Sequence, residues 1–173
     1  MVQILLHPSL AAFEAERARA TLGRAITHTF AVGIILGTLH GCVNWLGARG
    51  AAAEIVTTGV MTALQLVAAL IVAQAFLFVA ARAMGGRGDF ATQAYLSALA
   101  FAPLYGSASL ADIAPSFGAI AAIAAMLWCA ILVALALRVA HGDNAWRVSN
   151  VGLFAVSCLG GMIAWWVMLS LPS

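Results

Sequence analysis

Residues 82–89, RAMGGRGD, have the composition of a ligand-binding loop in an otherwise apolar chain. They hold three glycines, two arginines and one aspartate. The N–H groups of a glycine-rich loop can cradle a phosphate, but a P-loop also needs a lysine and a preceding strand, and this sequence contains no lysine. A dinucleotide fingerprint needs a βαβ unit, which this helical sequence does not offer. We therefore interpret the segment as a turn between two helices.

The residue types of this segment fit such a turn. Glycines after a helix permit left-handed caps. Asp89 is predicted to cap the next helix, whose first turn is Phe90-Ala91-Thr92. Arg87-Gly88-Asp89 also spells an adhesion tripeptide, but the topology given below places it in the cytoplasm, which argues against extracellular adhesion.

The histidines are the other candidates for chemistry. His28 and His40 fall inside the first apolar segment, where a proton relay or a metal site would be the functional interpretation. Metal sites need more ligands and a relay needs partners. We therefore interpret both as neutral histidines that are hydrogen-bonded to the backbone or, for His40, to Asn44.

Catalytic motifs are missing from the sequence. It contains no HExxH, no GxSxG and no intramembrane aspartate pair. His141 and Asp143 have no nucleophile nearby, and they fit a helix end at which Gly142 is the C-cap. We expect no catalytic, cofactor-binding or metal-binding residues, no enzyme and no nucleic-acid partner.

The composition identifies the elements that must position these residues. Hydrophobic residues make up 64% and charged residues 8% of 173 residues, whereas soluble domains contain about 25% charged residues. About 20 apolar residues in a helix span the hydrocarbon core. The sequence therefore predicts an all-α polytopic membrane protein, a bundle of five transmembrane helices near residues 26–47, 56–80, 91–111, 117–138 and 150–170.

The arginines predict the orientation of the bundle. Seven of the eight lie on the N-terminal side of the membrane, and only Arg49 lies on the other. The positive-inside rule then places the N-terminus in the cytoplasm and the C-terminus outside. Abundant alanine and the missing lysine suggest a GC-rich bacterial genome, and hence the bacterial inner membrane.

Two regions are predicted along the chain. Residues 25–173 form the transmembrane domain, and residues 1–24 form a cytoplasmic amphipathic segment that is helical over 9–24. Leu10 and Phe13 share one face of that helix. It either lies on the cytoplasmic leaflet or extends the first span into solvent, and both alternatives stay open.

Four short stretches in residues 82–147 carry a family resemblance. They are GGRGDF, AYLSALAFAPLY, IAPSFGAI and RVAHGDNAWR, in this order. Their sequence and spacing resemble the C-terminal half of the Yip domain, whereas residues 1–81 match it only in hydropathy and length. The resemblance implies a small multi-pass protein with a cytoplasmic N-terminus, of a kind that interacts with Rab GTPases in eukaryotes. Eukaryotic members have a longer N-terminal region that is implicated in partner binding, so the resemblance implies the architecture and does not carry over the Rab partner.

Small residues predict close helix packing. Gly33, Gly37 and Gly41 form a GxxxGxxxG stripe, which lets helix backbones approach closely. The partner helix is either in the same chain or in a second copy, so a homodimer is possible. Pro103 is predicted to kink the third span, because proline lacks a backbone donor.

Two functional hypotheses remain. The first is a non-enzymatic protein that contacts the lipid bilayer and organises an unknown protein partner through its cytoplasmic loops. The candidate contact residues are Arg82, Gly85, Gly86, Arg87, Gly88, Asp89, His141, Gly142 and Asp143. The alternative is a small transporter, lipid-moving protein or permease subunit, with the polar, kinked third span beside a solute path.

Overall fold

The computed structural model describes residues 2–47, 51–113 and 115–142, without the side chains of residues 2, 3, 102–119 and 122. The described residues form helices and no strand. The helices are α1 (Val2–Leu6), α2 (Leu10–Arg17), α3 (Leu22–Leu46), α4 (Ala52–Ala83), α5 (Phe90–Ile113) and α6 (Pro115–His141). Pro115 occupies the first position of α6, where its missing N–H costs no helical hydrogen bond.

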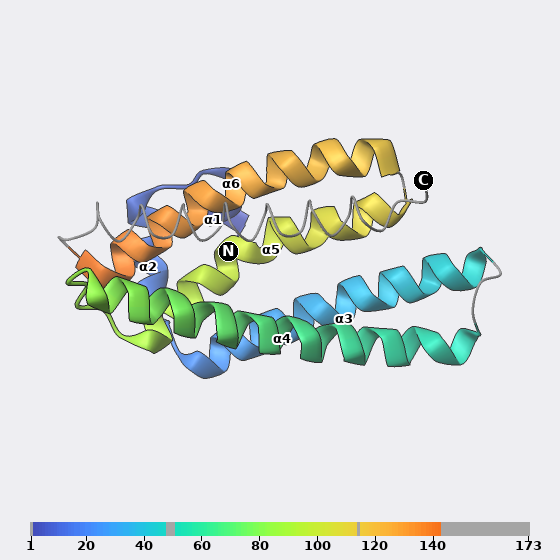
Figure 1. Ribbon diagram of the computed structural model, residues 1–173, viewed down its shortest axis with the longest axis horizontal. Coiled ribbons are helices and arrows are strands. Elements are labelled where there is room, and N and C mark those ends of the chain that lie inside the picture. The colour runs from blue at the N-terminus through green and yellow to red at the C-terminus, as the bar shows by residue number, and fades with distance from the viewer. Residues whose placement is uncertain (1, 48–50, 114, 143–173) are drawn as a thin grey trace.

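The four long helices form two antiparallel hairpins. α3 pairs with α4 and α5 with α6, and α5 also packs against α3 and α4 (Figure 1). The start of α3, the end of α4, the start of α5 and the end of α6 gather at one end of the bundle (Figure 1). We call this the arginine end, because Arg24, Arg82, Arg87 and Arg138 all lie there.

The apolar segments fold as membrane-spanning helices. Three helical segments of the described chain are long and apolar enough to cross a membrane, namely Leu22–Leu46, Ala52–Ala83 and Ile123–His141. α5 is a further helix of 24 residues at the position of the predicted third span. The predicted fifth span, 150–170, lies outside the described residues.

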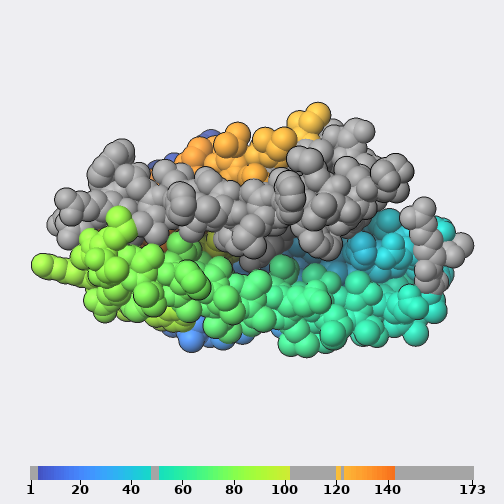
Figure 2. All heavy atoms as spheres, viewed as in Figure 1, coloured from blue at the N-terminus to red at the C-terminus, as the bar shows by residue number. Residues whose placement is uncertain are grey.

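The bulky apolar side chains on the surface of α4 are those expected of a membrane-spanning helix. Its exposed side chains include Val72, Phe76 and Val79, and Phe76 is 80% exposed. The helix runs along the length of the face shown in Figure 2. Bulky apolar side chains at a surface are stable in lipid, where no hydrophobic penalty opposes their exposure.

The N-terminal segment differs from the prediction. A single helix over 9–24 is wrong, because α2 ends at Arg17 and α3 begins at Leu22. Thr21 has an extended backbone (φ −144°, ψ 151°), and its side chain accepts a hydrogen bond from the Arg24 N–H, so it acts as the N-cap of α3. α2 is therefore not an extension of the first span.

α2 and the unpredicted α1 dock on the bundle. Phe13 of α2 is completely buried in a core that includes Leu96 of α5 and Leu132 of α6. The indole N–H of Trp128 in α6 donates to the Leu5 carbonyl of α1 over 3.1 Å. The apolar face of this segment therefore packs on protein.

The glycine stripe of α3 faces α4 in the same chain. A Cβ added to Gly37 would lie 2.7 Å from both the Thr58 carbonyl oxygen and the Thr62 Cβ, and a Cβ on Gly41 would lie 2.8 Å from the Ile55 Cα. Gly33 approaches the Ala63 backbone in the same way. The stripe is thus occupied within one chain, and a homodimer would need another surface.

α5 continues as an α-helix through Pro103. The side chains of residues 102–119 lie outside the described residues, so the predicted kink stays a prediction.

Candidate functional site

The segment 82–89 is a turn built on a helix-ending glycine motif. Gly85 has φ +88°, a conformation that glycine adopts without steric cost. Its N–H donates to the Arg82 carbonyl over 3.0 Å, and the Gly86 N–H donates to the Ala81 carbonyl over 2.8 Å. These two bonds form a Schellman motif, which satisfies the last carbonyls of α4. The predicted glycine cap is confirmed.

Asp89 closes the other side of the turn. Its Oδ1 accepts a hydrogen bond from the Thr92 N–H over 2.8 Å, so the predicted cap of the next helix is also confirmed. The hydrogen bonds from Thr92 hold the pKa of Asp89 below its ordinary value, and they outweigh the opposite effect of partial burial.

The turn lies directly against the end of α6. A Cβ on Gly86 would lie 2.7 Å from the His141 Nδ1. A Cβ on Gly88 would collide with the Ala140 carbonyl oxygen and would lie 2.9 Å from the His141 Nδ1. Glycine is therefore required at both positions by the close approach of α6. The turn at 82–89 and the end of α6 at His141, which are distant in sequence, meet here.

His141 joins the turn to the helix bundle. The Gly88 N–H donates to Nδ1 of His141 over 3.1 Å. Since Nδ1 accepts, the neutral ring carries its proton on Nε2, which lies 2.7 Å from Oε1 of Gln93 and donates to it. Both ring nitrogens thus have partners, and the side chain is 3% exposed.

The hydrogen-bond chain continues from Gln93 in α5 to Gln74 in α4. Nε2 of Gln93 donates to the Gln74 side-chain oxygen over 2.9 Å and to the Gln74 backbone carbonyl over 3.2 Å. Gln74 and Gln93 are both fully buried. Three helices and the glycine turn are therefore connected by one buried polar network.

Aromatic contacts surround this network. Phe78 lies edge to face with Phe90 at 5.6 Å between ring centroids, and its ring centroid is 6.1 Å from that of His141. The Arg82 guanidinium carbon lies 5.3 Å from the Phe78 ring centroid, within the range of a cation–π interaction. The apolar rings exclude water from the histidine and also hold an exposed arginine beside the turn.

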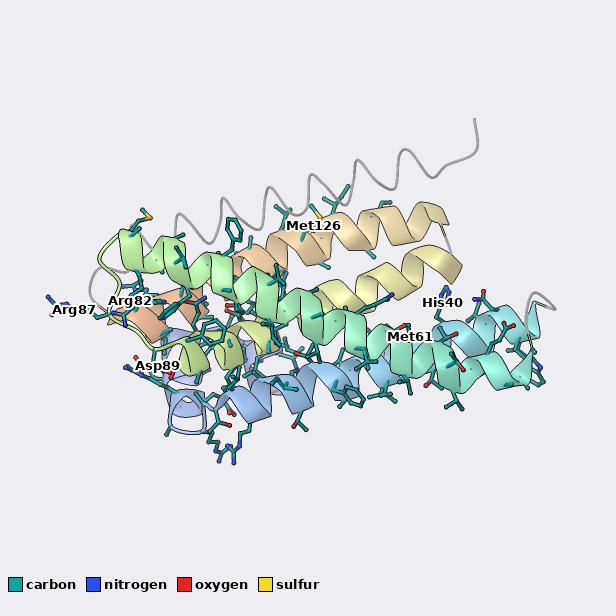
Figure 3. The ribbon with its side chains drawn as sticks, turned by 60° about the horizontal axis from the view of Figure 1, so that its bottom comes forward. His40, Met61, Arg82, Arg87, Asp89 and Met126 are labelled. Carbon is teal, nitrogen blue, oxygen red and sulfur yellow. The ribbon has the colours of Figure 1, made fainter. Side chains whose placement is uncertain are left out.

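The structure divides the candidate contact residues into two groups. Arg82, Gly85, Arg87, Asp89 and Gly142 are exposed, whereas Gly86, Gly88 and His141 are buried. Figure 3 shows Arg82, Arg87 and Asp89 at one end of the bundle, with His40 towards the opposite end. Asp143 lies outside the described residues. Only the exposed group is available to a partner.

Gly142 has φ +73°, as expected for the left-handed cap predicted after His141. The inward direction of the His141 side chain was not predicted. Gln93 was missed, and its only signal was a polar side chain at the start of an apolar span.

The remaining candidates do not form a ligand cluster. Within the residues that the structure describes, no group of three His, Cys, Asp or Glu side chains could hold a metal ion. His28 is half-buried in α3, and its Nε2 has no hydrogen-bond partner among the described residues. Gln65 is exposed and Gln74 is buried, so the two glutamines of α4 lie on different faces of the helix.

A comparison with protein families gives one match. The model of the Yip1 domain matches residues 2–168, nearly the whole chain. No curated protein and no solved structure matches the chain.

Proposed function

Because the chain belongs to the Yip1 domain family and is a helical multi-pass membrane protein, we propose that it acts without enzymatic chemistry, by presenting a shaped cytoplasmic surface to a protein partner. We call this surface the turn face and define it by Arg82, Gly85, Arg87, Asp89 and Gly142. The N-terminus lies in the cytoplasm and the C-terminus outside, in a bacterial inner membrane.

The observation that supports this role is the buried network beneath the turn face. Gly88, His141, Gln93 and Gln74 connect the turn to three helices. A turn held in this way keeps its exposed charges at fixed positions, which lowers the entropy lost when a partner binds. The two arginines and the aspartate offer a charge pattern that favours one partner over others.

Photo-crosslinking tests the turn face. A photoreactive amino acid at position 87 is expected to form a discrete protein adduct in native membranes, because Arg87 is exposed. The same probe at position 76 is the matched control, since Phe76 is exposed on α4 towards lipid. Reversal of charge at Arg82 should weaken the adduct at position 87. Equal adducts from both positions, or none from position 87, would contradict the proposal.

The alternative role, a conduit for a solute or a lipid, has less support. The polar side chains of α5 that the structure describes, those of Thr92, Gln93, Tyr95 and Ser97, are all buried. Gln93 binds Gln74, and the Tyr95 hydroxyl donates to Glu16 over 2.9 Å. Solvent labelling of a cysteine at position 97, in a chain lacking the native cysteines, separates the two roles. A conduit predicts a reactive cysteine, and a packed helix predicts a protected one.

A further inference from the structure

A cleft of about 500 Å³ opens at the arginine end between α2, α3 and α5. Its rim is formed by Glu16, Arg19 and Arg24. This cleft is separate from the turn face and from the network around His141. Its polar and apolar lining residues follow one another along the axis of α3.

The order of the lining residues follows from the helix register. Arg24, Thr27, His28 and Ala31 have the spacing of one face of α3, and all four line the cleft. Seven residues separate Arg24 from Ala31, or roughly 10 Å along the helix axis. Along α3 the lining thus changes from guanidinium groups through a hydroxyl and an imidazole to the apolar Ala31, and Leu99 of α5 also lines the cleft. Phospholipids have the same order of charged, polar and apolar groups.

The rim has more positive than negative charge. Arg19 Nη1 lies 3.7 Å from Glu16 Oε1, and the Tyr95 hydroxyl donates to Glu16 Oε2 over 2.9 Å. The Glu16 carboxylate is therefore countered by Arg19. Arg24 Nη1 donates to the Arg19 backbone carbonyl over 3.0 Å, which holds a second guanidinium at the rim. Guanidinium groups bind phosphate oxygens through paired N–H donors.

His28 gives an independent indication of a ligand. Its Nε2 is buried in the wall of the cleft and meets no hydrogen-bond partner within the described part of the chain. A buried polar atom without a partner destabilises the fold, so such an atom is a candidate for a bond to a ligand. His28 lies one turn deeper than Arg24, at the depth of the glycerol esters of a lipid whose phosphate binds at the rim.

We propose that this cleft binds one anionic phospholipid from the cytoplasmic leaflet. Arg24 and Arg19 bind the phosphodiester, the glycerol ester region reaches Thr27 and His28, and one acyl chain lies over Ala31 and Leu99. The excess positive charge selects an anionic headgroup over a zwitterionic one.

Native mass spectrometry of the full-length protein in detergent tests this site, with phosphatidylglycerol or phosphatidylethanolamine added. Wild type is expected to retain one phosphatidylglycerol molecule preferentially. Arg24→Gln should weaken retention of phosphatidylglycerol on the order of tenfold, because it removes about one charge-assisted hydrogen bond to the phosphate. Arg17→Gln is the control, because Arg17 pairs with Glu14 at 3.6 Å and does not line the cleft. It should leave retention unchanged.

A second variant tests the apolar part of the cleft lining without changing the charge. Ala31→Phe should fill the cleft and remove retention, while thermal melting shows that the fold persists. If both cleft variants fold and bind like wild type, or if Arg17→Gln weakens binding as much as Arg24→Gln, the proposal is overturned. Glycerol 1-phosphate, added alone as a soluble competitor, should not displace the lipid at millimolar concentration. Displacement would identify a soluble phosphate ester as the ligand and overturn the lipid assignment.

Discussion

The N–H of Gly88 donates a hydrogen bond to Nδ1 of His141 across 53 residues of sequence. This bond joins the glycine turn, which precedes α5, to the last residue of α6. It also fixes the histidine tautomer, so that Nε2 donates to Gln93. The exposed turn and the buried glutamines thus belong to one hydrogen-bond network. The position of the turn face therefore depends on residues that are buried beneath it.

Substitutions of His141 should lower stability in a graded order. His141→Leu removes both bonds and leaves the Gly88 N–H unpaired, at a cost of about 1–3 kcal/mol for each buried group. His141→Asn should be milder, because its side-chain oxygen can replace Nδ1 as the acceptor for Gly88. Thermal unfolding in detergent measures both. His7→Leu is the control, since His7 is exposed. Equal stability of wild type and His141→Leu would contradict the role of the network.

Gly88→Ala should displace the turn from α6. The added methyl group would collide with the Ala140 carbonyl, a backbone atom that cannot rotate away. Overpacking of this kind typically costs about 1–3 kcal/mol. Gly23→Ala is the matched control, because a Cβ at Gly23 meets no atom within 4 Å. Protease sensitivity of the 82–89 segment should rise in Gly88→Ala and stay unchanged in Gly23→Ala.

Gly37→Leu should separate α3 from α4. Even a Cβ at this position lies 2.7 Å from Thr58 and Thr62, so a larger side chain has no space. Ile35→Leu should be nearly silent, because Ile35 is 65% exposed. A disulfide between cysteines placed at positions 41 and 55, with the native cysteines removed, should form within one chain. Crosslinked dimers from this pair would show instead that the stripe joins two copies.

The stability of the first turn of α5 should depend on pH through the Asp89 cap. Its folded pKa lies below the ordinary value of 3.8. The cap therefore contributes fully above that value, and its contribution is lost as the pH falls through the folded pKa. Asp89→Ala should cost about 1 kcal/mol near neutral pH, and Asp89→Asn much less. The protection of the Thr92 amide, which is its exchange rate relative to the intrinsic rate at the same pH, reports the cap, and it should lose its acid dependence in Asp89→Asn.

The orientation can be tested with reporter fusions. A cytoplasmic reporter fused after Asp89 should be active, because the described arginines gather at that end of the bundle. A periplasmic reporter should be active when fused after Ser173. Activity of a periplasm-only reporter after Asp89 would reverse the proposed topology.

Local features of the fold were predictable from the sequence, and tertiary pairings were not. Apolar runs marked the positions of α3 to α6, and the glycines and Asp89 gave the turn, because these signals act within a few residues. The helix break before Thr21 was missed, since alanines and arginines at 17–20 favour helix on propensity alone. Gln93 and His141 could not be paired, because 48 residues separate them and only the packing of α5 on α6 brings them together.

The bond between the Trp128 indole and the Leu5 carbonyl has a consequence for biosynthesis. Its two partners are separated by 123 residues, so a ribosome that adds about 5–20 residues per second completes the acceptor roughly 6–25 s before the donor. The first residues of the chain thus leave the ribosome long before their docking site exists. During that interval their apolar side chains must be sheltered by the lipid surface or by a chaperone. The bond that docks α1 therefore forms only after α6 has been synthesised, which makes it a late event in assembly.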